Sequence, residues 1–443
     1  MKDQFGNSIS TQSAGVRDYF DGAAELIRLY RGDPIAALDA ALDADPNFCL
    51  GWAIRAAAIG TTTDKALLGE AERSLRAGAA CAEGASQRER DHLAAARDWC
   101  EGRFLEAVSR WGRIAQDFPR DILALQFAHV GDFFLGQQHE LRNRPIQALR
   151  AWKAGEIGHG AILGMAAFGL QENGDYARAE GFGREGVEAD RRDGWAAHAV
   201  AHVCEMQGRS LEGAAFLEAT ADGWAPESGF AYHNWWHLAL FALDHEDHKR
   251  ALELFDAKVR PQQTDVVMEM LDASALLWRL KLLNVDVGDR FATLASSWER
   301  AMTDCYYSFN EIHALLAMLG AGRGREADCI VAALRERAES DDENGLMTRQ
   351  VALPLAQALM AFDAERYGEA ADALHHVRGR AQRFGGSHAQ RDIISLTLFE
   401  AAMRAGRREQ AQALAAERIA FKPESAWART LYRRAKAEQR QAA

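Results

Sequence analysis

Histidines occur in pairs four residues apart at two places in the chain. His198 and His202 form the first pair, and His233 and His237 form the second. Residues four apart lie one above the other on the same face of an α-helix, so each pair presents two imidazoles to one side. Glu205 lies one turn after His202 and extends the same stripe. Four imidazoles beside a carboxylate can carry out acid–base chemistry or hold a metal ion.

Two kinds of chemistry remain open for these four histidines. Close imidazoles and carboxylates shift one another's pKa values, so the group can supply a general acid and a general base near neutral pH. A helical pair with four-residue spacing is also a common metal chelate, in which Glu205 or Asp272 would complete or orient the ligand shell. Ala199 stands where a zincin motif carries its glutamate, so the spacing permits a divalent metal without specifying one. The cofactor therefore stays unknown, and a metal is the less favoured alternative.

Other expected helices carry further candidates. We predict a catalytic group that consists of His198, His202, His233, His237, Asp272 and Glu205. Its four histidines are also the candidate metal ligands. We predict a substrate-binding group that consists of Asp132, Trp236, Trp278, Asn310, His313, His388 and Arg391. An arginine can clamp a substrate carboxylate with two hydrogen bonds, and tryptophans can wall a small-molecule pocket. Each residue also has a plain structural interpretation, because most single buried histidines and tryptophans are core residues that form hydrogen bonds.

The elements that must position these residues form a repeat of two helices and a turn. Apolar-striped segments alternate with Ala-rich segments, and the turns between them lie near Gly174, Gly208, Glu246, Gly288, Gly322, Arg366 and Gly406. Successive turns are 34 to 44 residues apart, and a period near 34 is typical of tetratricopeptide arrays. Because one helix pair cannot bury both of its faces, the pairs stack on their neighbours. The first helices of adjacent repeats then run side by side, which brings the two histidine pairs together.

The chain is therefore predicted to be all-α, a tetratricopeptide-like solenoid that is closed or strongly curved. We expect one domain over residues 1–443, with less regular repeats in 1–158, clear repeats in 159–420 and a C-terminal helix in 424–443. The helix-forming composition, with only 8 prolines, agrees with this class.

Charge and cysteine content disfavour several classes of function. A net charge of −12 without a basic cluster argues against nucleic-acid binding. The six cysteines are scattered without C-x-x-C spacing and are expected to be buried free thiols in a reducing compartment. The first residues lack an apolar leader segment, and no run of about eighteen apolar residues occurs, so we expect a cytoplasmic protein without a membrane partner. The sequence also lacks the common phosphate-loop and serine-hydrolase motifs.

Several stretches resemble the tetratricopeptide repeat protein 38 family, and the resemblance extends over nearly the whole chain. The matching stretches are Gly194–Arg209, Tyr232–Asp244, Leu271–Leu280, Phe309–Arg323 and Gly385–Arg407. The resemblance implies a closed-up superhelix whose first helices line the interior. The family's motif positions coincide with candidates at His198, His202, Glu205, His233, Trp236, His237, Asp272, Asn310, His313, His388, Arg391 and Asp392. Glu311 departs from the pattern, where an aspartate is expected. The resemblance implies an architecture and no reaction.

These observations favour an enzyme that acts on a small metabolite, which can bear a carboxylate. Its reaction class is unassigned, with hydrolase, lyase and isomerase chemistry all open. The alternative is a peptide- or protein-binding adaptor without catalysis, the commonest use of tetratricopeptide grooves. Adaptors that clamp a peptide carboxylate line their groove with Lys, Arg and Asn, whereas the first helices here offer His, Trp and Asp. A module that only binds a metabolite is a third interpretation, and a homo-oligomer is compatible with all three.

Overall fold

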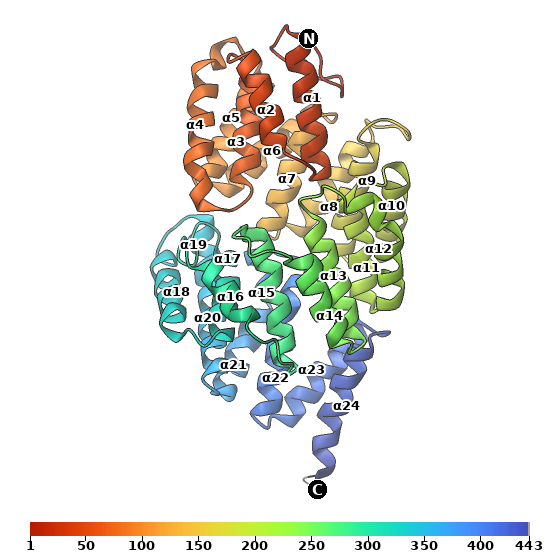
Figure 1. The fold of residues 1–443 in the computed structure, drawn as a ribbon, viewed down its shortest axis with the longest axis vertical. Coiled ribbons are helices and arrows are strands. Elements are labelled where there is room, and N and C mark those ends of the chain that lie inside the picture. Colours follow the sequence, from red (N-terminus) through yellow and green to blue (C-terminus); the bar gives the residue numbers. More distant parts are fainter. Residues whose placement is uncertain (442–443) are drawn as a thin grey trace. The chain divides into compact units, whose positions relative to one another are not determined.

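The computed structural model describes residues 1–441, and helices make up most of this part of the chain (Figure 1). Consecutive helices pack in pairs joined by short turns, as in tetratricopeptide arrays. The predicted all-α, tetratricopeptide-like class is confirmed. Contacts between Cα atoms divide the chain into two compact units, which we describe separately. The first unit contains Met1–Val200 and Thr220–Ala231, and the second contains Ala201–Ala219 and Tyr232–Ala443.

The helices follow one another with few long breaks. The first unit contains α1 (Ala14–Leu29), α2 (Pro34–Ala44), α3 (Cys49–Gly60), α4 (Leu68–Ala80), α5 (Gln87–Cys100), α6 (Phe104–Asp117), α7 (Ile122–Phe134), α8 (Gln138–Leu149), α9 (His159–Glu172) and α10 (Tyr176–Ala189). Both units share α11 (Gly194–Gln207) and α12 (Ser210–Trp224). The second unit continues with α13 (Ala231–Asp244), α14 (His248–Leu254), α15 (Val267–Leu282), α16 (Arg290–Trp298), α17 (Ser308–Gly320), α18 (Gly324–Arg337), α19 (Glu343–Met347), α20 (Leu353–Asp363), α21 (Tyr367–Arg378), α22 (His388–Arg404), α23 (Arg408–Phe421) and α24 (Ala426–Gln441).

The turns within the helix pairs lie where the period predicts them. Six of the seven predicted turn positions have a left-handed backbone. At the remaining turn the left-handed residue is Glu365, one position before the predicted Arg366. Gly208 shows why glycine suits such a turn. Its φ is 74°, and a Cβ atom there would lie 2.5 Å from the backbone nitrogen of Ser425. A larger residue would therefore push the start of α24 away from the turn between α11 and α12.

The second unit closes on itself, because its last helices return to the helices that carry the histidines. The Nζ atom of Lys422, directly after α23, lies 2.6 Å from Oε1 of Glu205 on α11, 217 residues earlier. Ser425 donates a hydrogen bond to Asp244 at the end of α13. Trp278 on α15 donates from Nε1 to Oγ1 of Thr397 on α22, at 3.0 Å. Curvature of the array is thus confirmed within this unit, while closure of the whole chain and its single-domain character stay predictions.

Two further predictions concern thiols and membranes. Within residues 1–441 none of the six cysteines forms a disulfide, but only Cys49 and Cys204 are buried and Cys329 is exposed. The expectation of burial is wrong for Cys329. The buried face of α18 is formed by Ala327, Ile330 and Leu334, and Cys329 lies outside this face. Within residues 1–441 no helix has the length and apolar character that crossing a bilayer requires. The cytoplasmic location and a homo-oligomeric state stay predictions.

Candidate functional site

Three first helices of the second unit, α11, α13 and α15, carry the central candidates. His202 lies on α11, His233 and His237 lie on α13, and Asp272 lies on α15. Apolar and aromatic residues cover α13 and α15 on almost every side, so both helices are buried in the unit. His202 and His237 have no exposed surface, and Asp272 is 2% exposed. Polar groups buried this deeply need one another as partners.

These side chains form a continuous chain of contacts. Nδ1 of His233 lies 2.6 Å from Oδ2 of Asp272, and Nε2 of His237 lies 3.1 Å from Nε2 of His202. The rings of His233 and His237 meet edge to face, with centroids 5.0 Å apart. The structure therefore brings together, within the second unit, the side chains Asp272, His233, His237 and His202, in that order. We call these four residues the histidine chain.

His198 lies one turn before His202 on α11 and belongs to the first unit. Its ring stacks on Phe168, with centroids 5.2 Å apart, and also contacts the rings of Trp195 and Phe230. These aromatic neighbours indicate a packed environment in that unit. A catalytic or ligating role for His198 stays a prediction.

Two imidazoles of the histidine chain are held neutral. Burial lowers the pKa of His202 well below its ordinary value, and the electrostatic effect of the neighbouring basic side chains, first among them His233, lowers it further. Burial also lowers the pKa of His237 in the same way, with His202 and His233 as the next causes. A neutral imidazole has one nitrogen that donates and one that accepts, so one of the two Nε2 atoms donates to the other. Neutral imidazole is also the form that accepts a proton or ligates a metal.

Fixed charges surround the histidine chain. Arg418 on α23 makes two hydrogen bonds to Asp392 on α22, at 2.7 and 2.8 Å. Lys422 lies 3.9 Å from the same Asp392 and pairs with Glu205. Glu205, predicted to be catalytic, thus forms an ion pair with Lys422. Burial raises the pKa of Asp392, but Arg418 and Lys422 outweigh this and hold that pKa well below its usual range.

Arg279 on α15 is buried without a carboxylate among its hydrogen-bond partners. It donates to the backbone oxygens of Ala275 and Ala389, and its guanidinium lies over the ring of Trp236, 5.3 Å from the centroid. Burial lowers its pKa to about 10, so it stays charged at neutral pH. Trp236, predicted to bind substrate, also stacks on His233 with centroids 5.2 Å apart. Trp236 therefore connects the buried cation to the histidine chain.

The other predicted substrate-binding residues of the second unit are mostly engaged with the protein. His313 donates from Nδ1 to the backbone oxygen of Phe309 at 2.8 Å, and burial lowers its pKa to about 4. Trp278 bonds to α22 as described above, and Asn310 is buried on α17. Nη2 of Arg391 lies 3.3 Å from Nδ1 of His388. Arg391 also donates to the backbone oxygens of Gly385 and Gly386 before α22.

Asp132 lies in the first unit and pairs with Arg144, whose Nε lies 2.8 Å from Oδ2. Burial raises the pKa of Asp132 to about 7 despite this partner. The structure does not group Asp132 with the histidine chain.

The sequence analysis missed the buried cations Arg279, Arg418 and Lys422. Arg279 carries a signal that could have found it, because it interrupts the apolar run Leu276–Leu280 of a helix. Arg418 and Lys422 carry no such signal, since they lie in an ordinary polar segment and become buried only where the second unit closes.

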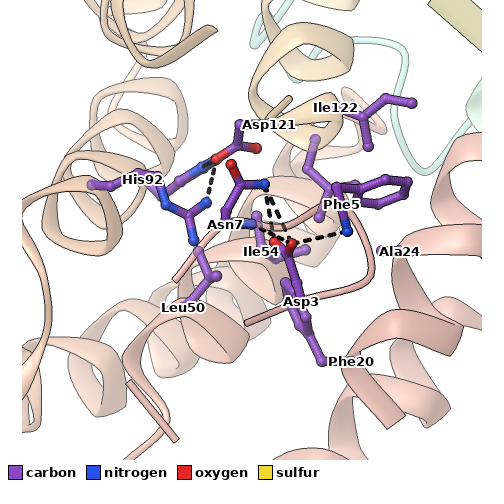
Figure 2. Close-up of a pocket in the computed structure, with 12 residues that line it drawn as sticks. Asp3, Phe5, Asn7, Phe20, Ala24, Leu50, Ile54, His92, Asp121 and Ile122 are labelled. Atoms are coloured by element: carbon purple, nitrogen blue, oxygen red, sulfur yellow. Dashed lines mark hydrogen bonds and ion pairs between the residues drawn. The ribbon is translucent and has the colours of Figure 1, made fainter. Parts of the chain in front are cut away.

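A second buried His–Asp contact lies in the first unit, where the N-terminal segment crosses α5 and α7 (Figure 2). Nε2 of His92 lies 2.9 Å from Oδ2 of Asp121, and Arg88 forms a buried ion pair with the same carboxylate. The other oxygen of Asp121 accepts from the backbone nitrogen of Ala124 and caps α7. The adjoining cavity is about 10 Å³, no more than one water molecule needs. This group therefore has a structural role, and we call Asp121, His92 and Arg88 the Asp121 joint.

Comparisons with known proteins find solved structures that align with most of the chain at low identity and low TM-score. No protein-family model matches the sequence. The crystal structure of yeast Tom70 is 12% identical, aligns with 97% of this chain and 90% of its own, and has a TM-score of 0.37. The structure of the P58(IPK) TPR domain is 14% identical, aligns with 89% of this chain and 99% of its own, and has a TM-score of 0.21. Alignment scores this low carry no information on what the site binds, and the tetratricopeptide-like helical-repeat class rests on the paired helices of the chain itself.

Proposed function

We propose that this helical-repeat protein is an enzyme that acts on a small anionic metabolite, with the chemistry carried by the histidine chain. The observation that supports the proposal is the continuous order Asp272, His233, His237, His202 in a buried part of the second unit. A carboxylate that accepts from Nδ1–H of a histidine fixes the tautomer and stabilises the imidazolium that forms when the ring takes a proton. The neutral imidazoles of His202 and His237 supply a base, or ligands for a metal that activates water.

The fixed charges around the chain support an anionic substrate. The buried or nearly buried cations include Arg279, Arg391, Arg418 and Lys422, and the carboxylates include Glu205, Asp272 and Asp392. Carboxylates pair with Arg418 and Lys422, whereas the guanidinium of Arg279 donates to the backbone oxygens of Ala275 and Ala389. A carboxylate or phosphate group of a substrate would pair with this guanidinium.

Peptide binding is the second candidate function. The observation that favours it is the fold, because stacked helix pairs present concave faces that suit an extended peptide. Arg279 and Arg391 would then receive the peptide's terminal carboxylate. Such an adaptor needs the cations and does not need the proton chemistry of His202 and His237, which separates the two functions by experiment.

We also propose membership of the tetratricopeptide repeat protein 38 family. The support is that the family's motif positions on α11, α13 and α15 supply the members of the histidine chain. Cytoplasmic location and a small-molecule partner remain parts of the same proposal.

The test is a thermal-shift screen of carboxylates and phosphates, followed by turnover measurements on the compounds that raise the melting temperature. We expect His202→Gln to lower kcat/KM by about 10²–10⁴-fold while helicity stays unchanged, because the buried base is lost. His376→Gln is the matched control, since His376 is exposed on α21. A His202→Gln protein that keeps full turnover, or that only melts at a lower temperature, would contradict the enzyme. Peptide binding unaffected by His202→Gln would favour the adaptor.

A further inference from the structure

We propose that His202, His233 and His237 bind one divalent transition-metal ion, with Asp272 as the residue that orients His233. The proposal rests on the proposed function, because it names the way in which the histidine chain acts. It selects the metal-assisted form of that chemistry, in which the bound ion would lower the pKa of a water molecule and so supply a hydroxide nucleophile.

The separation of the imidazole nitrogens is the first observation. Two nitrogens bound to one metal at about 2.0–2.1 Å lie about 3.3 Å apart in tetrahedral geometry and about 2.9 Å apart at a right angle. The Nε2 atoms of His202 and His237 are 3.1 Å apart, which falls between these values. A hydrogen bond between the two rings has the same length, so this distance alone does not separate the two arrangements.

The third histidine supplies the second observation. Ring nitrogens of His202, His233 and His237 all lie within 4.8 Å of one another. Closing the widest of these separations to about 3.3 Å requires a movement of about 1.5 Å, which a side-chain rotation can supply. Three histidines from two adjacent helices would then face one point, leaving a fourth position for water or substrate. Three protein ligands with an open position are typical of catalytic zinc sites.

The contact of Asp272 with His233 is the third observation. Metal-ligating histidines commonly donate their other ring N–H to a carboxylate, which fixes the ring's orientation and raises its basicity. Nδ1 of His233 lies 2.6 Å from Oδ2 of Asp272, and Asp272 comes from a different helix, α15. The tautomer that donates from Nδ1 carries its lone pair on Nε2. The contact therefore assigns Nε2 of His233 to the metal.

Burial and ligand type indicate which metals fit. Three imidazoles suit zinc, copper, iron and nickel better than magnesium or calcium, which prefer oxygen ligands. The nearby cations Lys422 and Arg418 oppose a dication, but each is paired with a carboxylate, Glu205 or Asp392. An anionic substrate in the open position would offset the positive charge of the metal ion. The metal and the anionic substrate are therefore complementary.

The experiment is titration of the full-length, chelator-treated protein with Zn²⁺ and with Co²⁺, whose absorption reports coordination. We expect one ion per chain, with visible Co²⁺ bands of a four-coordinate nitrogen and oxygen site. His202→Gln and His237→Gln should each weaken Zn²⁺ binding at least about 100-fold, and Asp272→Asn about 10–100-fold. His376→Gln is the control, because His376 lies exposed on α21 of the same unit and belongs to neither predicted group. That variant should bind Zn²⁺ as the native chain does.

A second variant covers the case in which the glutamine variants do not fold. His237→Cys keeps a metal ligand and adds a thiolate-to-Co²⁺ charge-transfer band in the near ultraviolet if residue 237 ligates the ion. Absence of that band in a folded His237→Cys protein would overturn the proposal. So would a native chain that binds no stoichiometric Zn²⁺ or Co²⁺. If the native chain binds no metal while His202→Gln still abolishes turnover, the metal site is overturned and the proposed enzyme stands with metal-free acid–base chemistry.

Discussion

Each unit contains a buried histidine against a buried aspartate, and the surroundings of the two contacts differ. In the first unit, Asp121 receives His92, Arg88 and the N-terminus of α7. Burial raises the pKa of Asp121, but His92 and Arg88 outweigh burial and hold it well below its usual range. In the second unit, Asp272 meets His233, and two further imidazoles follow. Partners beyond the pair therefore distinguish the two contacts, because those of Asp121 hold α5 and the start of α7 together, whereas the contact of Asp272 continues into the histidine chain.

The largest effect on stability is expected in the first unit. Asp121→Ala removes the acceptor of Arg88, His92 and a helix cap in one step, and leaves a buried guanidinium unpaired. We expect a loss of about 3–5 kcal/mol in the free energy of unfolding, measured by urea denaturation. A loss below about 1 kcal/mol would show that this joint contributes little to stability, and the structural role that we assign to the Asp121 contact would be wrong.

Acid should destabilise the second unit through its neutral histidines. His313 has a pKa of about 4 in the fold and about 6.5 when unfolded, so the unfolded chain binds the proton first as the pH falls. Its stabilising contribution is complete above pH 6.5 and is lost as the pH falls towards 4, by about 3 kcal/mol in total. His202 and His237 act in the same direction.

The measurement that isolates this effect is the difference in the free energy of unfolding between the native chain and His313→Gln, followed from pH 7 to pH 4. Subtraction removes the opposite contribution of Asp132, whose raised pKa of about 7 makes stability fall as the pH rises. The native chain should lose stability more steeply on acidification. Equal slopes would mean that His313 does not resist protonation in the fold.

The fold and the central part of the site were predictable because the repeat fixes their register. The four-residue spacing of His233 and His237 fixes one helical face, and equivalent positions in neighbouring first helices bring His202 and Asp272 to it. The pairing of Lys422 with Glu205 was not predictable, because it depends on closure across 217 residues. The Asp121 joint was missed for a related reason: the non-repeating N-terminal segment completes it, with Arg88 donating to the backbone oxygen of Ser8.

Asp272→Asn should have a smaller effect on stability than Asp121→Ala. Asparagine keeps an oxygen that accepts from Nδ1 of His233, so the contact loses its charge and keeps its shape. We expect a loss of about 1 kcal/mol in the free energy of unfolding, measured by urea denaturation alongside Asp121→Ala. A loss as large as that of Asp121→Ala would make Asp272 a structural joint too, and the two regions would no longer differ.

The most direct test of the histidine chain as the chemical centre compares His237→Gln with His92→Gln in the full-length protein. Each variant is scored for its melting temperature and for its stabilisation by the carboxylates and phosphates that stabilise the native chain. We predict that His92→Gln lowers the melting temperature and keeps the ligand-induced shift, whereas His237→Gln keeps its helicity and loses the shift. A His237→Gln protein that responds to these ligands as the native chain does would contradict the account.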